Sequence, residues 1–460
     1  MNTDTNLKMN TIKKIAVRAL LTGTSCLFFI NSALAGIPIE HWTQISGVQV
    51  FLVPSPVIPM VDVQIDFDAG SRRDPANQAG LASVTARMAD KGVLASATEP
   101  ALDENALSEA WADLGASFGA GASPDRMSFA LRSLTYPDLL GKATQLAARQ
   151  LGEPAFPDAI WQRERETLNA AIKEANTRPA TLAARAFNAE VYGPHPYGFE
   201  MTQETLARIS VADMKAVYGT LIQPCRAKVT VVGAVNRAQA DALVTQLFSR
   251  LLAKMPSGCP ALPAVADVAP LDKPAEQHIA FASAQAHVLI GQPGFKRNDP
   301  DYFPLIVGNY ILGGGGFVSR LTEEVREKRG LSYSVYSYFS PGLHNGAFTV
   351  GLQTRPDQAD KAVQVSRDVV ANFVTHGPTQ AELKAAKDNL IGGFALRIDS
   401  NRKLLDNVAN IAWNNLPLDY LDTWTQQVEV VTAADIKAAF VRKLQPGKMV
   451  TVVLGAESVK

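Results

Sequence analysis

The chain has 460 residues, of which 19% are charged and 47% are apolar, and it carries 44 basic and 44 acidic side chains. This composition is typical of a globular protein, and the even charge balance argues against binding to nucleic acid or to anionic membranes. A chain of this length exceeds what one hydrophobic core usually supports, so we predict at least two domains.

Residues 1–35 have the pattern of a secretory signal peptide. Basic residues within 13–18 precede an apolar stretch over 19–30, and Ala33-Leu34-Ala35 matches a cleavage site. We therefore predict a signal peptide over 1–35, cleavage near Ala35, and a periplasmic or otherwise exported mature chain.

Two alternatives concern this first segment. Cys26 raises the possibility of a lipoprotein signal, but the preceding Gly23-Thr24-Ser25 lacks the usual leucine, so we disfavour lipidation. Met1 and Met9 both remain possible starts. No later apolar run reaches the roughly 18 residues that a membrane span requires, so we predict none.

Two of the three cysteines, Cys225 and Cys259, follow the predicted signal peptide. An even pair in an oxidising compartment favours a disulfide. Two buried free thiols remain the alternative, because a sequence does not show whether the Cα atoms come within bonding distance.

An internal repeat indicates two similar halves. Residues 210–218 and the segment 227–234 are echoed by 432–440 and 448–456, each pair predicting a helix followed by a strand. Both helices open with Ser or Thr three residues before Asp, as in a capping box. Each half also begins with two predicted strands, over 49–53 and 61–67 in the first half and over 278–281 and 286–290 in the second.

Long helical periodicities fill out both halves, over 136–151, 159–175, 359–374 and 380–396. Strands followed by runs of helices favour an α+β fold, with each domain a sheet on which helices pack. A proline-rich stretch over 255–275 is typical of a linker. We therefore predict an N-terminal domain over 36–254 and a C-terminal domain over 276–460.

The second half contains four consecutive glycines, Gly313, Gly314, Gly315 and Gly316. Such a run permits close approach of another chain. The next residues predict a helix whose buried face carries Val318, Leu321 and Val325, with Gly330 as its stop. A half-buried strand is predicted over 331–339. Arg326 near the helix end and Tyr333 on the strand are therefore expected to converge beside the glycines.

This string resembles the signature of the second homologous domain in the pitrilysin/insulinase family of zinc peptidases, the inverzincins. The resemblance implies two similar domains that form half a clamshell. It also implies that Arg326 and Tyr333 bind the substrate carbonyl and its developing oxyanion, at an active site completed by another chain, beside a substrate-binding Gly313–Gly316 loop. Without the resemblance, Arg326 among its neighbouring glutamates would be an ordinary surface ion pair, and Tyr333 would be strand packing.

The zinc motif of the family is not conserved in this chain. Active members carry H-x-x-E-H on the helix after the second strand, where two histidines bind zinc and the glutamate activates water. The matching residues, fixed by the flanks 69–72 and 79–82, read Ser83-Val84-Thr85-Ala86-Arg87. Ser83 and Arg87 replace the histidines, and Ala86 replaces the base.

The third zinc ligand is missing too. In the family it is a glutamate that follows a Glu-Arg pair, and here Ala171 stands at that position after Glu164-Arg165. Glu166 and Glu174 are out of phase with it. The six histidines are not spaced as metal ligands; they are His41, His195, His278, His287, His344 and His376. His195 lies in a glycine- and proline-rich segment that predicts a turn. We therefore predict no metal bound by this chain.

These residues lead to one hypothesis and two alternatives. The chain is expected to be the non-catalytic, substrate-binding subunit of a heterodimeric zinc metallopeptidase that acts on peptides or unfolded segments. Its partner would be a paralogous H-x-x-E-H subunit that carries the zinc. The main alternative is a scaffold homologue without a proteolytic role, since the core proteins of the mitochondrial cytochrome bc complex resemble this family without working as peptidases. An enzyme with a rebuilt metal site lacks any supporting cluster of ligands.

Overall fold

The computed structural model describes residues 36–253 and 258–455. The predicted signal peptide lies outside these residues. Within the described part of the chain, no helix has both the length and the apolar character needed to cross a membrane.

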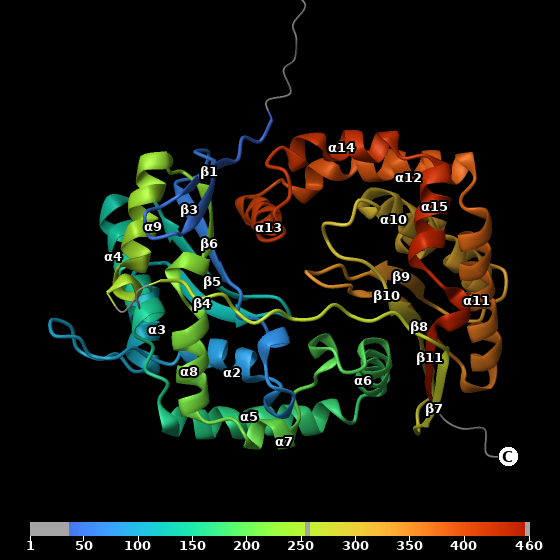
Figure 1. Ribbon diagram of the computed structural model, residues 1–460, viewed down its shortest axis with the longest axis horizontal. Helices are drawn as coiled ribbons and strands as arrows, with labels where there is room; N and C mark the ends of the chain where they lie inside the picture. Colours follow the sequence, from blue (N-terminus) through green and yellow to red (C-terminus); the bar gives the residue numbers. More distant parts are fainter. Residues whose placement is uncertain (1–35, 254–257, 456–460) are drawn as a thin grey trace, which may run out of the picture. The chain divides into compact units, whose positions relative to one another are not determined.

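Two sheets organise the chain, one in each half (Figure 1). The first has the order β1-β2-β6-β3-β5-β4, and the second has the order β7-β11-β8-β10-β9. In both, the last strand of the half lies between the first two long ones and pairs parallel to one of them and antiparallel to the other. The first sheet comprises β1 (Glu40–Thr43), β2 (Gln49–Pro54), β3 (Met60–Phe67), β4 (Ser117–Ala122), β5 (Met127–Leu134) and β6 (Lys228–Gly233); the second comprises β7 (Ala275–Ala280), β8 (Ala286–Pro293), β9 (Val335–Phe339), β10 (Ala347–Thr354) and β11 (Val450–Gly455).

The four long helices and the strands that open each half are confirmed, but α12 is shorter than expected: it ends at Gly392, and a 3₁₀ turn over Phe394–Arg397 follows it. The segment after the glycine run differs from its prediction and is described with the site. Both capping boxes are present, at Ser210 with Asp213 and at Thr432 with Asp435. The helices are α2 (Leu81–Ala89), α3 (Glu104–Asp113), α4 (Pro137–Gly152), α5 (Asp158–Ala175), α6 (Pro179–Tyr192), α7 (Gln203–Ala207), α8 (Val211–Leu221), α9 (Arg237–Leu252), α10 (Tyr302–Asn309), α11 (Ala359–His376), α12 (Gln380–Gly392), α13 (Asn401–Trp413), α14 (Tyr420–Val430) and α15 (Ala433–Lys443). The α+β prediction is therefore correct.

Each sheet packs one face against helices of its own half. In the first half, Val50 and Leu52 of β2 share a core with Leu247 of α9 and Leu151 of α4. In the second half, Phe440 of α15 packs edge-on against a phenylalanine of α11, with ring centroids 4.8 Å apart. These two cores bury the strand residues that point to one side.

The opposite face of each sheet is covered by a helix from the other half. Phe51 and Val53 of β2 form a cluster with Leu404 and Val408 of α13. Reciprocally, the strand β11 packs against Phe187 of α6 and its neighbours. Adjacent strand residues point to opposite faces of a sheet. Helices α13 and α6 therefore each cover the second face of the sheet in the other half.

Polar contacts fix the C-terminal end of α13 on the first sheet. The Lys228 ammonium on β6 donates to the Ala412 carbonyl and to Asn415 Oδ1, at 2.7 Å each. The guanidinium of Arg126 lies over the Trp413 ring, 5.7 Å from its centroid. Burial lowers the pKa of Lys228, and the nearby Asp66 carboxylate opposes that shift. Cations at this end of a helix also complement its dipole.

Lys228→Met should weaken this attachment. The substitution keeps the length of the side chain but leaves the acceptors at the end of α13 without their donor, so we expect the free energy of unfolding to fall by about 1–3 kcal/mol. Urea unfolding followed by circular dichroism measures the change. Lys448→Met is the matched control, because Lys448 is exposed and makes no ion pair within the described residues. Equal effects of both substitutions would contradict this role for Lys228.

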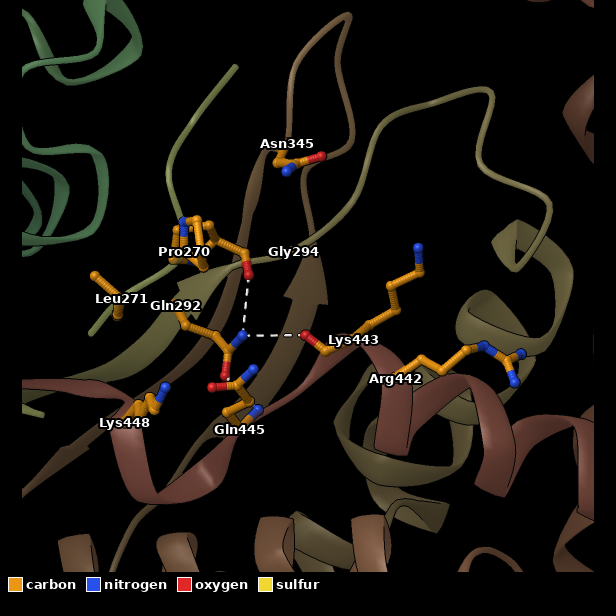
Figure 2. A pocket seen from close by; sticks show the side chains of 10 residues that line it. Pro270, Leu271, Gln292, Gly294, Asn345, Arg442, Lys443, Gln445 and Lys448 are labelled. Carbon is orange, nitrogen blue, oxygen red and sulfur yellow. Dashed lines mark hydrogen bonds between the residues drawn. The ribbon is translucent and has the colours of Figure 1, made fainter. Parts of the chain in front are cut away.

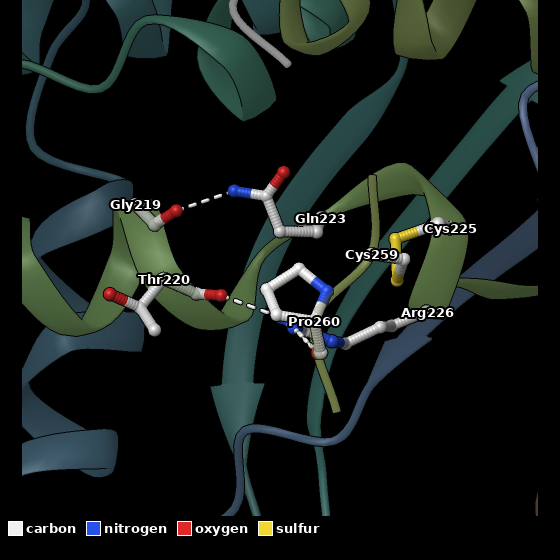
Figure 3. The surroundings of a disulfide bond; sticks show 7 residues. All are labelled: Gly219, Thr220, Gln223, Cys225, Arg226, Cys259 and Pro260. Atoms are coloured by element: carbon white, nitrogen blue, oxygen red, sulfur yellow. Dashed lines mark hydrogen bonds between the residues drawn. A yellow bond between two sulfur atoms is a disulfide. The ribbon is translucent and has the colours of Figure 1, made fainter. Parts of the chain in front are cut away.

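The linker after the first half follows the surface of that half. Cys225 and Cys259 form a disulfide with Cα atoms 6.1 Å apart, and the Arg226 guanidinium donates to the Thr220 and Pro260 carbonyls beside it (Figure 3). Farther along, Arg73 donates to the Pro263 carbonyl at 3.0 Å. The disulfide and these hydrogen bonds therefore hold the start of the linker against the first half.

The cysteine pair should be oxidised in exported protein, so thiol titration of unfolded, unreduced chain should find neither residue. With a sequence separation of 34 residues, the chain-entropy model assigns the bond about 3–4 kcal/mol of stability. Replacing both cysteines by serine should lower the free energy of unfolding by that order. Two titratable thiols would contradict the prediction.

Candidate functional site

The backbone around the glycine run differs from a regular helix. Helix α10 continues as a π-helical turn over Tyr310–Gly314, and a second π-helical turn spans Thr322–Glu327. Leu321 and Val325 are buried as predicted, but Val318 is 73% exposed. The prediction that Val318 shares their face was wrong, because Val318 lies on a separate 3₁₀ turn that starts at Gly316 with φ +62° and ends at an extended Ser319, so helical phase is lost before Leu321.

The glycines serve close packing as well as the turn. A Cβ on Gly313 would lie 2.5 Å from the backbone nitrogen of Ser337 on β9. A Cβ on Gly315 would lie 2.7 Å from the backbone carbonyl oxygen of Tyr310. A Cβ on Gly316 would meet no atom within 4 Å. The run therefore lets the end of α10 approach β9, and Gly316 sits at the open end of the loop.

Strand β9 begins later than predicted, at Val335, so Tyr333 precedes the strand instead of lying on it. The Ser332 hydroxyl donates to the Ser334 carbonyl at 2.6 Å and accepts from its N–H, a local turn that competes with strand pairing. Within β9 the buried side chains are Val335 and Ser337, and the Ser337 hydroxyl donates to Asn309 Oδ1 at 2.7 Å. The tyrosines of this strand consequently face outward.

The structure brings Arg326 and Tyr333 together, as the sequence predicted. The Arg326 guanidinium carbon lies 5.0 Å from the centroid of the Tyr333 ring and 4.8 Å from that of Phe317. The two rings are 83% and 75% exposed. An arginine held between two aromatic faces keeps its N–H groups available in a fixed plane. Phe317 was not predicted; its place directly after the glycines was the available signal.

The acidic residues near Arg326 are mostly paired elsewhere. Glu324 accepts from Lys328 and from Arg329, at 2.6 Å each, and these hydrogen bonds hold its pKa below the ordinary value. Among the acidic residues that the structure describes, Arg326 pairs only with the neighbouring Glu327, with 3.4 Å between Nε and Oε1. The simple interpretation of Arg326 as one more member of a surface ion-pair network therefore accounts for few of its donors.

The positions that match the zinc motif lie on α2 and α5. The Arg87 Nε donates to Glu164 Oε2 at 2.5 Å, and the Lys91 ammonium lies 3.2 Å from the other oxygen of Glu164. Burial acts to raise the pKa of Glu164, but the bonds from Arg87 and Lys91 outweigh it and hold the pKa below its usual value. Ala86 is buried and Ala171 is exposed. These residues do not fit a zinc ion, because a guanidinium and two methyl groups offer no ligand.

The remaining candidates do not assemble a ligand set. Among the described residues, no group of three or more His, Cys, Asp or Glu is placed to hold a metal. Glu174 pairs with Arg178, and Glu166 is exposed. His195 and His344, distant in sequence, have ring centroids 5.1 Å apart, a contact that the sequence did not indicate.

His195 instead has a structural role. Its Nδ1 accepts from the Tyr197 N–H at 3.1 Å, and its Nε2 lies 3.0 Å from the Ala266 carbonyl in the linker. Burial lowers the pKa of His195, which favours the neutral ring that this arrangement requires. The predicted turn is present at His195, and it also holds the linker.

One hollow in the second half has a volume of about 260 Å³ (Figure 2). Its Gln292 donates to the Lys443 carbonyl and accepts from the Gln445 N–H. Two of the cations that line it are paired, Arg442 with Asp301 at 2.6 Å and Lys443 with Asp299. These contacts leave Gln292, Arg442 and Lys443 with partners inside the protein.

Comparison with known proteins identifies the family. Residues 49–204 match the model described as insulinase (peptidase family M16), and residues 208–390 match the peptidase M16 inactive domain. A crystal structure of a peptidase M16 inactive domain from Pseudomonas fluorescens is 34% identical, with a TM-score of 0.85 over 92% of this chain and 99% of that one. The chain belongs to the insulinase family.

Curated relatives agree with this assignment. A Helicobacter pylori protein named "Non-peptidase homolog YmxG" is 27% identical over 83% of this chain and 85% of its own length. An uncharacterised zinc protease of Streptomyces coelicolor is 35% identical, but the match spans only 35% of each chain. Together with the residues at the motif positions, these similarities support a non-catalytic role within the insulinase family.

The purified chain should contain no stoichiometric zinc by elemental analysis, since Ser83, Ala86, Arg87 and Ala171 supply no ligand set. Ser83→His, Ala86→Glu and Arg87→His combined should still leave it without tightly bound zinc, because Ala171 offers no third ligand. The quadruple variant that adds Ala171→Glu is the matched comparison, because it also restores a carboxylate at the position of the third ligand. One zinc per wild-type chain would contradict the assignment.

Proposed function

We propose that this chain is the substrate-binding, non-catalytic subunit of a heterodimeric zinc peptidase of the insulinase family, acting in the periplasm on peptides or unfolded segments. The observation that carries the proposal is the exposed group of Arg326 with Phe317 and Tyr333. Within the described residues, few of the Arg326 N–H donors are taken up by an acidic partner. The motif positions of the family supply no metal ligand in this chain.

The chemistry of this group suits a peptide. A guanidinium donates only, and a phenol can donate, so both match a carbonyl oxygen and the negative charge that develops on it during attack. The Tyr333 hydroxyl makes no hydrogen bond within the described residues. Zinc and the general base would come from an H-x-x-E-H partner chain, so this chain alone should not cleave peptides.

Export is part of the proposal. The pattern over 1–35 supports it, and so does the disulfide between Cys225 and Cys259, since disulfides persist in oxidising compartments. Isolation of the tagged chain from periplasm should recover a paralogue of similar length that carries H-x-x-E-H. Recovery of a stable complex without a peptidase would favour the scaffold alternative.

Tyr333→Phe tests the role of the site in the assembled complex. Loss of one well-placed donor to a transition state typically costs roughly 10² to 10³ in rate, and we expect a fall of that order with zinc content and subunit association unchanged. The fall should appear in kcat if the hydroxyl serves the oxyanion, and in KM alone if it binds only the ground state.

Tyr136→Phe is the control, because Tyr136 is also an exposed tyrosine (51%) but lies in the first half of the chain. Full activity of a complex that carries both Arg326→Ala and Tyr333→Phe would overturn the proposed role.

A further inference from the structure

A second binding feature lies next to Tyr333, between α6 and the open face of the second sheet. It is a cleft of about 290 Å³, with Tyr336 and Tyr338 of β9 on one side and Ala180 and Ala184 of α6 on the other. Ser334 also lines it, so the cleft begins one residue from Tyr333. This volume is near the lower end for ligand pockets, which suits one large side chain better than a whole ligand.

The two tyrosines form an aromatic wall with free faces. Their rings are stacked with centroids 5.9 Å apart and an angle of 23° between the planes, and they are 43% and 44% exposed. The hydroxyl end of the Tyr336 ring lies over Gly351, where a Cβ would be 2.5 Å from both Cζ and the hydroxyl oxygen. The absence of a Cβ on Gly351 therefore lets the ring lie against the sheet, with its outer face open for stacking.

None of the described residues that line the cleft is charged. Its polar groups are neutral ones, including Asn188, His287 and Gln353. Burial lowers the pKa of His287, so that ring is uncharged at neutral pH. The hydroxyls of Tyr336 and Tyr338 make no hydrogen bond within the described part of the chain. A charged guest would lose hydration here without gaining a counter-ion, whereas a neutral aromatic ring would not.

We propose that this cleft binds an aromatic side chain of the peptide that Arg326 and Tyr333 hold, so that the chain selects peptides with Phe, Tyr or Trp next to the bound segment. The inference rests on the proposed function. It adds a preference that neither the family assignment nor the Arg326 group supplies. The small alanines of α6 and the flat tyrosine wall together define a slot for a planar ring.

The test uses the mature chain and three fluorescein-labelled peptides of glycine and serine that carry a single central Phe, Ala or Asp. Fluorescence anisotropy gives each Kd. Burial of one aromatic ring should make the Phe peptide bind about tenfold or more tighter than the Ala peptide, and the Asp peptide should bind no better than the Ala peptide.

Ala184→Leu should fill the cleft and bring the Phe/Ala affinity ratio close to one. Ala189→Leu is the matched control, because Ala189 is exposed on the same helix and does not line the cleft, so the ratio should persist. Tyr338→Phe should keep the ratio and Tyr338→Ser should reduce it. A wild-type ratio near one, or a ratio that survives Ala184→Leu, would overturn the inference.

Arg326→Ala separates this inference from the proposed function. If both are correct, the substitution weakens all three peptides alike and leaves their ratio unchanged. An unchanged affinity for every peptide, with the ratio intact, would overturn the proposed role of Arg326 while the cleft assignment stands. Failure of all three peptides to bind the wild-type chain at millimolar concentration would overturn both.

Discussion

The fold depends on a reciprocal exchange in which each half covers the sheet of the other. The central strands β6 and β11 are buried almost throughout, which requires packed helices on both faces. Helices of the same half cover one face, and α13 or α6 covers the second. A half folded alone would expose Val232 and Phe51, or the alternate valines of β11. The two halves are therefore separate in topology but dependent on each other for stability.

This exchange also shapes the cleft beside β9. Because α6 covers β11 and part of β8, it leaves β9, at the edge of the sheet, uncovered. The tyrosines of β9 become the wall of a cleft instead of core residues. The glycine run at the end of α10 packs against the buried side of the same strand, at Ser337. The packing of β9 thus orients both the cleft and the segment that carries Tyr333.

The sequence predicted the elements that depend on near neighbours. The capping boxes at Ser210 and Thr432 and the strand predicted over 61–67 are local patterns, and the structure contains them. Tertiary contacts decided the rest. The outward orientation of Tyr336 depends on a hydrogen bond between Ser337 and Asn309, 28 residues apart. An amphipathic pattern indicates that α13 is buried, but it does not say which sheet the helix covers.

The candidate site shows the same division. The spacing of Arg326 and Tyr333 was readable, whereas the contact with Phe317 requires the positive φ at Gly316 and the π-helical turns that follow. A sequence period of 3.6 residues does not describe such a backbone, so Val318 was placed on the wrong face. The meeting of His195 with His344 likewise depends on how the linker crosses between the halves.

Electrostatics explains why the residues at and near the zinc-motif positions of α2 form stable ion pairs instead of an incomplete metal site. Glu164 is buried, and an ionised carboxylate there needs positive charge nearby. Arg87 supplies it directly from the position of a lost histidine, and Lys91 adds a second cation. The Arg87 side chain is 46% exposed while Glu164 is buried, so loss of Arg87 would leave a buried carboxylate with Lys91 as its remaining cation. Arg87→His would thus remove the guanidinium that neutralises Glu164, and Ala171 would still supply no zinc ligand. The ion pairs stabilise α2 in its place, while the groups suited to bind a peptide lie in the other half of the chain.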